Sequence, residues 1–193
     1  YTRHAAYTRE YLVVLKSLLA GEQVSFQGEF FRVNAQLSVP DVTDVPVLVA
    51  ALGPRMLQVT GELADGTITW MTGIKTLEGF TVPTIRAAAQ AAGRPEPRVV
   101  AGLPIALTSD PARARDVAGK AFQMYGTLPS YRAMLDREGV ESPGDVALAG
   151  DEATLRAELG RLRDAGVTDF GASLFPADEG APERTLEFLK SEL

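Results

Sequence analysis

Apolar and polar residues follow one another in an order of strand, helix and strand that is densest between Val45 and Gly73, with the sequence VPVLVAALGPRMLQVTGELADGTITWMTG. The stretch from Val45 to Ala51 is apolar at nearly every position, which predicts a strand buried on both faces, as in a parallel sheet. Pro54 then begins a helix, and Asp65-Gly66 leads into a second strand at Thr67 to Met71. This order within about 30 residues is typical of one βαβ unit.

Helical and strand patterns continue on both sides of this unit. Apolar residues at helical spacing predict helices at residues 3–20, 82–92, 111–125, 128–138, 152–165 and 182–193. A short hairpin is predicted at Gln23 to Val33, and further strands are predicted at residues 98–107 and 168–175. Residues 34–44 and 73–79 are predicted to be loops, and Pro104 predicts a bulge or bend in its strand.

The alternation of strands and helices predicts the fold class. Four candidate parallel strands, near residues 47, 68, 101 and 171, are each followed by a helix, which is typical of an α/β architecture. A complete TIM-type (β/α)₈ barrel takes about 250 residues, and this chain supplies about half of its strands. We interpret residues 1–193 as a single domain, the C-terminal part of such a barrel, whose N-terminal strands are absent from the given sequence.

Composition excludes several classes of function. The formal net charge of −6 argues against nucleic acid as a partner, because proteins that bind phosphate backbones are normally basic. The absence of cysteine excludes disulfides, zinc–thiolate sites and a cysteine nucleophile, and the single histidine, His4, argues against a transition-metal site, so no metal is expected. No apolar run approaches the roughly 20 residues of a membrane span, and no signal peptide is visible, so a cytoplasmic location is expected.

Motifs of other enzyme classes are missing. Neither G-x-G-x-x-G nor G-x-x-x-x-G-K-[ST] occurs, so nucleotide binding of the Rossmann or P-loop kind is unsupported. The segment Gly171 to Phe175 begins like a nucleophile elbow but lacks the last glycine, and only His4 could serve as its base. The charged residues of helix 152–165 are expected to form a solvated face, with ion pairs worth about 0.3–0.5 kcal/mol each.

Small and polar residues gather where the two strands of the βαβ unit end. The first strand end leaves room for a ligand at backbone N–H groups, to which the following helix directs its positive end. The second adds a hydroxyl, an unobstructed backbone and a cation, so together they could hold a phosphate or another anion. An ordinary βα turn, in which glycine only permits positive φ, explains them equally well. The residues are Ala50, Ala51, Gly53, Pro54, Thr72, Gly73 and Lys75.

The same stretch resembles a known family. The segments PVLVAALGPRML at residues 46–57, GELADG at 61–66 and WMTG at 70–73 resemble the luciferase-like monooxygenase superfamily, particularly its coenzyme F420-dependent oxidoreductases. The hairpin FQGEFF at residues 26–31 and the segment AGVTDF at 165–170 also match, so the resemblance covers most of the chain. The segments AALGP and ADG are fairly specific for the superfamily, while the choice of F420 over FMN rests on residues 70–75.

The resemblance implies a barrel that binds a deazaflavin or flavin at the C-terminal ends of its strands and transfers hydride between F420 and a small organic substrate. The protein then supplies orientation and electrostatics. In this family the residues nearest the reactive ring come largely from earlier strands, so no catalytic residue is assigned. Dimers are frequent in the family, and a homodimer is compatible with this chain. The residues implied to contact the cofactor are Ala51, Leu52, Gly53, Pro54, Trp70, Met71, Thr72, Gly73 and Lys75.

Three alternatives stay open. The first is an FMN-dependent luciferase-like monooxygenase. The second is a non-catalytic folded fragment or assembly module that pairs with another copy to cover its sheet edges. The third is a barrel lyase or isomerase in which Thr72, Gly73 and Lys75 hold a substrate phosphate. The substrate is not identified, because the loops expected to select it, at residues 73–79 and 123–150, vary without changing a fold.

Overall fold

The computed structural model describes residues 3–39 and 45–193, so the predicted loop at 34–44 lies partly outside the described residues. The chain forms two compact units. Unit 1 holds the chain up to Thr67 together with Thr84–Arg98, and unit 2 holds Ile68–Pro83 and Val99–Leu193.

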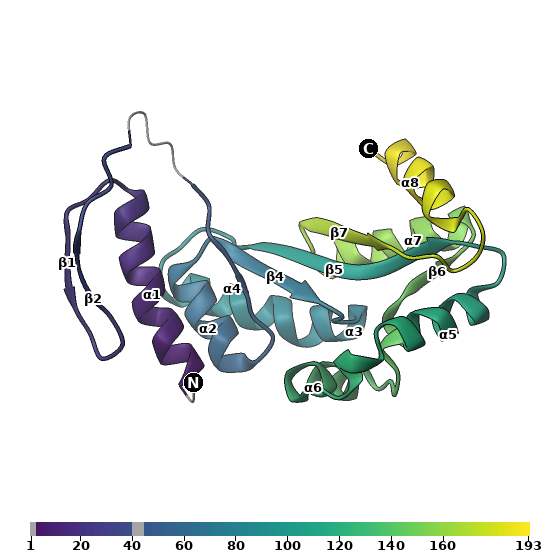
Figure 1. Ribbon diagram of the computed structural model, residues 1–193, viewed down its shortest axis with the longest axis horizontal. Helices are drawn as coiled ribbons and strands as arrows, with labels where there is room; N and C mark the ends of the chain where they lie inside the picture. The colour runs from purple at the N-terminus through teal and green to yellow at the C-terminus, as the bar shows by residue number, and fades with distance from the viewer. Residues whose placement is uncertain (1–2, 40–44) are drawn as a thin grey trace. The chain divides into compact units, whose positions relative to one another are not determined.

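Unit 1 confirms the predicted opening helix, hairpin and second helix. The strands of the hairpin are antiparallel, with Val24 opposite Ala35. Gly21 follows the first helix with a positive φ of 75°, as is common for a glycine that ends a helix. The elements of unit 1 are α1 (His4–Leu19), β1 (Val24–Gln27), β2 (Arg32–Ala35), β3 (Leu48–Ala50) and α2 (Pro54–Leu63), while β4 (Gly66–Trp70) and α4 (Val82–Ala91) each belong partly to unit 2 (Figure 1).

One carboxylate fixes the hairpin to α1. Glu10 accepts hydrogen bonds from the backbone N–H groups of Glu29 (2.8 Å), Phe30 (2.8 Å) and Phe31 (3.1 Å). Burial raises the pKa of Glu10, but these backbone bonds outweigh it and lower the pKa below its ordinary value of 4.5. The rings of Phe30 and Phe31 pack against Tyr7, with centroids 5.6 and 4.7 Å away. The hairpin is thus held by a carboxylate and by aromatic contacts.

A second carboxylate, Asp65, joins four segments of unit 1. It accepts hydrogen bonds from the Lys16 ammonium (2.8 Å), the Arg94 guanidinium (2.8 Å) and the Val47 N–H (2.8 Å). Its own N–H donates to the Val47 carbonyl (2.8 Å), and its carbonyl accepts from the Arg98 N–H (3.0 Å). Asp65 therefore connects α1, the residues before β3, the segment after α4 and the start of β5 (Arg98–Leu107).

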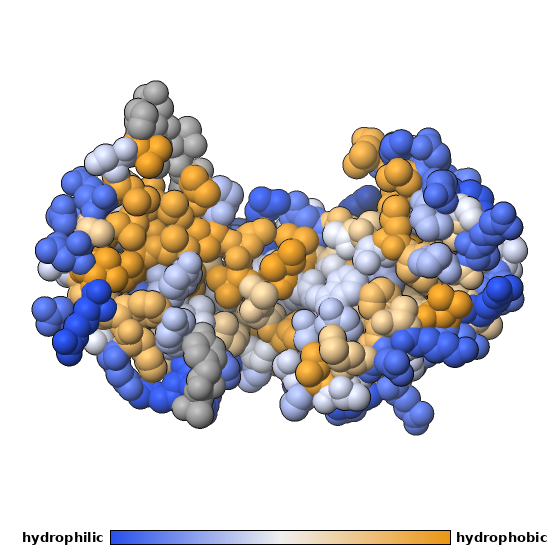
Figure 2. All heavy atoms as spheres, viewed as in Figure 1, coloured by the Kyte–Doolittle hydropathy of each residue, from blue (hydrophilic) through white to orange (hydrophobic). Residues whose placement is uncertain are grey.

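The prediction that the first strand is buried on both faces is wrong. Strand β3 is half-buried at Leu48 and Val49 and exposed at Ala50. Val47 and Val49 pack against the buried cluster of Leu12, Val59 and Ala64, which lines one face of the strand. Figure 2 shows hydrophobic residues gathered on the visible face of the part that holds α1; the exposed hydrophobic residues of unit 1 include Tyr11, Val13, Leu37, Val39 and Val45.

Unit 2 is built on β5. This strand pairs in parallel with β7 (Asp169–Leu174) on one side and with β6 (Leu148–Gly150) near its end. Val99, Ala101, Leu103 and Ile105 point to one face of the strand and are completely buried. The other elements are α3 (Ile74–Thr76), a π-helical segment (Leu77–Thr81), α5 (Pro111–Ala121), α6 (Pro129–Glu138), α7 (Glu152–Asp164), α8 (Ala181–Ser191) and 3₁₀ turns at Gln123–Gly126 and Pro143–Val146.

The parallel pairing of β5 with β6 and β7 confirms the α/β class, although the described strands do not close into a barrel. The predicted helices and strands of unit 2 are confirmed, apart from small differences at their ends. The three residues of β6 were missed, because so short a strand has no visible periodicity. No helix in the described ranges is long and apolar enough to cross a membrane.

The predicted loop at residues 73–79 is wrong, because the chain is helical from Ile74 to Ala91. The middle of this segment, Leu77–Thr81, is π-helical and ends just before Pro83. Proline has no N–H, so a regular α-helix would leave a carbonyl group without its donor one turn earlier. A π-helical turn at this position accommodates the interruption and allows the helix to continue.

Pro104 lies opposite Ser173 in an uninterrupted register between β5 and β7, so the predicted bulge is wrong. The Gly102 carbonyl accepts a hydrogen bond from the Met71 N–H (3.1 Å) on the side of β5 where β4 lies. The nitrogen of Pro104, two residues later, faces the same side, beyond β4 and before the pairing with β6 begins at Ile105. Proline therefore costs no sheet hydrogen bond there.

Replacing Asp65 by asparagine is expected to destabilise the protein. The change leaves the cations of Lys16 and Arg94 side by side without their counter-charge, and we expect a loss of about 2–3 kcal/mol in the free energy of unfolding. Urea denaturation followed by circular dichroism measures it. Glu152→Gln is the matched control, because its ion pair with Arg156 is exposed and should contribute less than about 0.5 kcal/mol. A similar small loss in both variants would contradict the role of Asp65.

The contribution of Asp65 should also depend on pH. Burial raises the pKa of Asp65, but the hydrogen bonds from Lys16 and Val47 and the charges of Lys16 and Arg94 lower it below its ordinary value of 3.8. A carboxyl group with a lowered pKa in the folded state stabilises the protein above its unfolded pKa and loses this effect as the pH falls through its folded pKa. The stability difference between wild type and Asp65→Asn should be constant from about pH 7 to 5 and shrink below about pH 4. A difference that grows in acid would contradict this assignment.

Candidate functional site

The first predicted strand end, residues 51–54, forms the turn from β3 to α2 in unit 1. Ala51 is buried, and its carbonyl lies 3.5 Å from the Thr67 hydroxyl, which also donates to the Val49 carbonyl (2.9 Å). Gly53 is the N-cap of α2, with extended backbone angles of φ −82° and ψ 159°. Its carbonyl accepts the first helical bond, from the Leu57 N–H (2.9 Å). The two elements thus hold this turn in a fixed backbone conformation.

The turn is open toward its surroundings. A Cβ atom added to Gly53 would have no atom within 4 Å. Within the described part of the chain, no side chain caps α2, and its first turn carries no acidic residue. The free N–H groups at the start of a helix attract anions. The β3–α2 turn therefore has the open backbone that the sequence predicted.

The second strand end, residues 70–75, forms the turn from β4 to α3 in unit 2. Met71 has a φ of 54°, the one positive value for a residue other than glycine in the described ranges. Such a conformation costs about 1–3 kcal/mol and is concentrated at functional sites. Met71 and Thr72 are completely buried, and the Thr72 hydroxyl lies 3.4 Å from the Trp70 carbonyl. No signal in the sequence indicated the strained backbone of Met71.

Aromatic side chains surround Trp70. Its ring meets those of Phe122 and Tyr125 edge to face, with ring centroids 5.6 and 6.0 Å away. The ring of Tyr131 packs in turn against that of Tyr125, with their centroids 4.8 Å apart. Burial is the larger of two causes that raise the pKa of Tyr131, and the charge of the neighbouring Tyr125 is the other. The indole N–H of Trp70 is buried and has no acceptor among the described residues. A buried donor without a partner is costly, so this indole N–H fits a ligand that brings an acceptor.

A residue that the sequence did not indicate completes the β4–α3 turn. Glu138, at the end of α6, accepts hydrogen bonds from the N–H groups of Lys75 (3.1 Å) and Thr76 (2.8 Å). The Lys75 side chain itself is exposed. Thr76 and Glu138 are 62 positions apart, so no local pattern links them. The structure thus groups residues 51–54 in one turn of unit 1 and residues 70–75 in one turn of unit 2.

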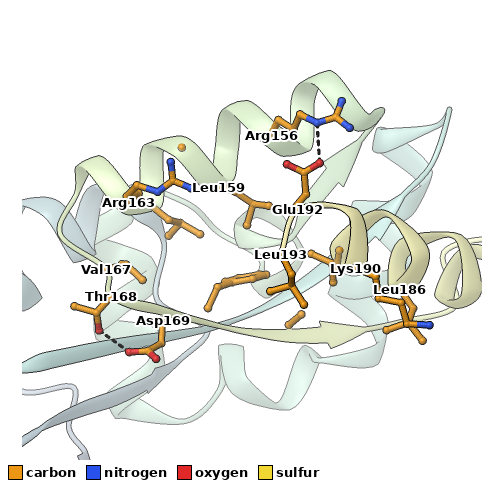
Figure 3. A pocket seen from close by; sticks show the side chains of 15 residues that line it. Arg156, Leu159, Arg163, Val167, Thr168, Asp169, Leu186, Lys190, Glu192 and Leu193 are labelled. Carbon is orange, nitrogen blue, oxygen red and sulfur yellow. Dashed lines mark hydrogen bonds and ion pairs between the residues drawn. The ribbon is translucent and has the colours of Figure 1, made fainter.

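Other features lie away from these turns. A cavity of about 650 Å³ opens between α7, β7 and α8, with Leu159, Phe170 and Leu186 in its lining and an ion pair of Arg156 with Glu192 (2.8 Å) at its edge (Figure 3). It contains none of the predicted cofactor residues. In the described ranges, no group of three or more His, Cys, Asp or Glu side chains could hold a metal ion.

The sequence of the chain is similar to those of known proteins. A family model described as luciferase-like monooxygenase matches residues 2–188. A 5,10-methylenetetrahydromethanopterin reductase of Methanolobus tindarius is 30% identical over 166 residues, which cover 84% of this chain and 49% of that protein. An F420-dependent glucose-6-phosphate dehydrogenase of Nakamurella multipartita is 27% identical over 156 residues, which cover 79% of this chain and 44% of that protein.

A solved structure has a similar fold. The coenzyme F420-dependent tetrahydromethanopterin reductase from Methanopyrus kandleri superimposes with a TM-score of 0.78 at 23% identity, over 98% of this chain and 62% of that one. The chain spans about half the length of the curated relatives it matches.

The two glycines should respond differently to alanine. Gly53→Ala is expected to change the free energy of unfolding by less than about 0.5 kcal/mol, because its Cβ would enter open space. Gly73→Ala is expected to cost about 1–3 kcal/mol, since its Cβ would lie 2.2 Å from Cδ of Glu138 and the displaced carboxylate would lose its hydrogen bonds from Lys75 and Thr76. Thermal and urea unfolding of both variants measure the difference, and equal losses would contradict the contrast between the two turns.

Proposed function

Because this chain belongs to the luciferase-like monooxygenase family, we propose that residues 1–193 form the C-terminal part of a single (β/α)₈ barrel domain in an F420-dependent oxidoreductase. The proposed reaction is hydride transfer between coenzyme F420 and a small organic substrate. The F420-dependent glucose-6-phosphate dehydrogenase supports F420 as the cofactor, and both sequence relatives, a reductase and a dehydrogenase, support an oxidoreductase. The two relatives therefore favour an oxidoreductase over the lyase or isomerase alternative.

The open β3–α2 turn is the observation that carries the proposal. It offers uncapped N–H groups at the start of a ten-residue helix beside a glycine with free space, which suits the phosphate of a flavin-type cofactor. The unpartnered indole N–H of Trp70 and the strained backbone of Met71 support a ligand at the β4–α3 turn. We propose that the cofactor contacts Ala51, Leu52, Gly53, Pro54, Trp70, Met71, Thr72, Gly73 and Lys75.

When bound, F420 supplies the hydride at C5 of its deazaflavin ring. The residues of this chain bind and orient the cofactor. The N–H groups at the start of α2 would donate hydrogen bonds to its anionic end, and the buried side chains of Met71 and Thr72 would keep water from the β4–α3 turn. No residue of this chain is assigned to the transfer itself, since the family places the residues nearest the ring on earlier strands.

FMN in place of F420 is the nearest alternative, and a fragment that binds no cofactor is the alternative from another class. The upstream sequence of the gene tests the fragment alternative: the main proposal expects about four further β/α units there, and the alternative expects none. A homodimer and a cytoplasmic location stay predictions drawn from the family and from composition.

Titration of the full-length protein with F420 and with FMN, followed by ligand fluorescence, tests the proposal. We expect F420 to bind in the micromolar range or tighter, and FMN to bind more weakly. Gly53→Val should weaken F420 binding by at least about tenfold while the fold is kept, since the added methyl groups occupy the open turn. Binding of neither ligand at micromolar protein would overturn the redox function, and unchanged affinity in Gly53→Val would show that the β3–α2 turn does not contact the cofactor.

A further inference from the structure

A carboxylate closes the β4–α3 turn. Oε1 of Glu138 accepts a hydrogen bond from the Lys75 N–H (3.1 Å), and Oε2 accepts from the Thr76 N–H (2.8 Å) and the Thr76 hydroxyl (2.7 Å). Backbone N–H groups at the start of a helix are the donors that an anion would use. These donors of Lys75 and Thr76 are therefore already engaged within the protein.

Gly73 admits this carboxylate. Its φ of −70° and ψ of 165° are accessible to any residue, so conformational freedom does not explain a glycine here. A Cβ atom at this position would lie 2.2 Å from Cδ and 2.6 Å from Cγ of Glu138. The missing side chain thus leaves room for Glu138, whereas the missing side chain of Gly53 leaves open space.

A second contact secures the end of α6. The guanidinium of Arg137 lies 3.8 Å from the centroid of the Phe80 ring, and Phe80 is one helical turn beyond Thr76. The Thr76 hydroxyl also lies 3.4 Å from the Met134 carbonyl. An external anion that displaced Glu138 would have to move the end of α6 away from these contacts.

We propose that Glu138 is a specificity-determining residue that excludes anionic groups from the backbone amides of the β4–α3 turn. A phosphate beside this carboxylate would be repelled, because like charges at contact distance oppose each other strongly. The inference rests on the proposed function in one respect: of the two turns, only the β3–α2 turn keeps free N–H groups for the phosphate of a cofactor.

Titration with inorganic phosphate, followed by the ¹H–¹⁵N signals of the Lys75 and Thr76 amides, tests the exclusion directly. The wild type should show no saturable shift at these amides. Glu138→Gln removes the charge and keeps an acceptor, while Glu138→Ala removes both, so we expect a saturable shift in the alanine variant and a smaller one in the glutamine variant. A saturable shift in the wild type, or none in either variant, would overturn the inference.

Asp136→Asn is the matched control, because Asp136 lies on the same helix in an exposed ion pair with Arg132 (2.7 Å). It should behave as the wild type. The remaining amide signals show whether each variant keeps its fold, and Glu138→Gln decides the test if the alanine change loosens α6.

Comparison of FMN with riboflavin, which lacks the phosphate, separates this inference from the proposed function. The affinity ratio of FMN to riboflavin should stay equal or rise in Glu138→Gln, and fall at least about tenfold in Gly53→Val. A fall in Glu138→Gln would overturn the inference. If neither flavin nor F420 binds, the proposed function fails, and the phosphate titration still decides the role of Glu138.

Discussion

The carboxylate of Asp65 is the constraint on which unit 1 depends. Its side chain is only 27% exposed, and a charge so far removed from water must be paired and hydrogen-bonded. Lys16, Arg94 and the N–H of Val47 supply these partners and thereby fix three segments around the start of β4. The next residue, Gly66, has no room for a side chain, because a Cβ atom there would lie 2.2 Å from the Arg98 carbonyl oxygen. The ADG segment, part of the family resemblance, is therefore explained by packing rather than by ligand binding.

The same principle recurs at Glu10 and Glu138. Each of these three carboxylates accepts backbone N–H bonds from a segment distant in sequence, and so joins elements that periodicity alone cannot place together. Glu10 fastens a hairpin to a helix, and Asp65 gathers the segments around β4. Glu138 occupies the start of a helix, where the same hydrogen bonds also decide which ligands can approach. A structural hydrogen bond thus becomes a determinant of binding.

The sequence predicted most elements because their apolar periodicity is local. The sequence-based prediction failed where the outcome depends on residues distant in sequence. It missed that β3 is only half-buried and that a helix begins at Ile74, where Glu138 accepts hydrogen bonds from its first turn. It also missed the regular pairing at Pro104, where no neighbouring strand needs an N–H group. The positions of the candidate site were predictable, because both lie at strand ends. The strained φ of Met71 and the unpartnered indole N–H of Trp70 were not predictable, since neither feature is signalled by the type of residue at its position.

Gly53 and Gly73 show why a local motif does not settle anion binding. Both follow a strand, both precede a helix, and both have extended backbone angles that other residues could adopt. One faces open space and the other faces the carboxylate of Glu138, more than sixty positions away. The amide groups of a βα turn bind an external anion only where no internal carboxylate already accepts their hydrogen bonds. The specificity of such a turn is therefore a property of the tertiary structure, and it follows from the partners of its N–H groups rather than from its glycine.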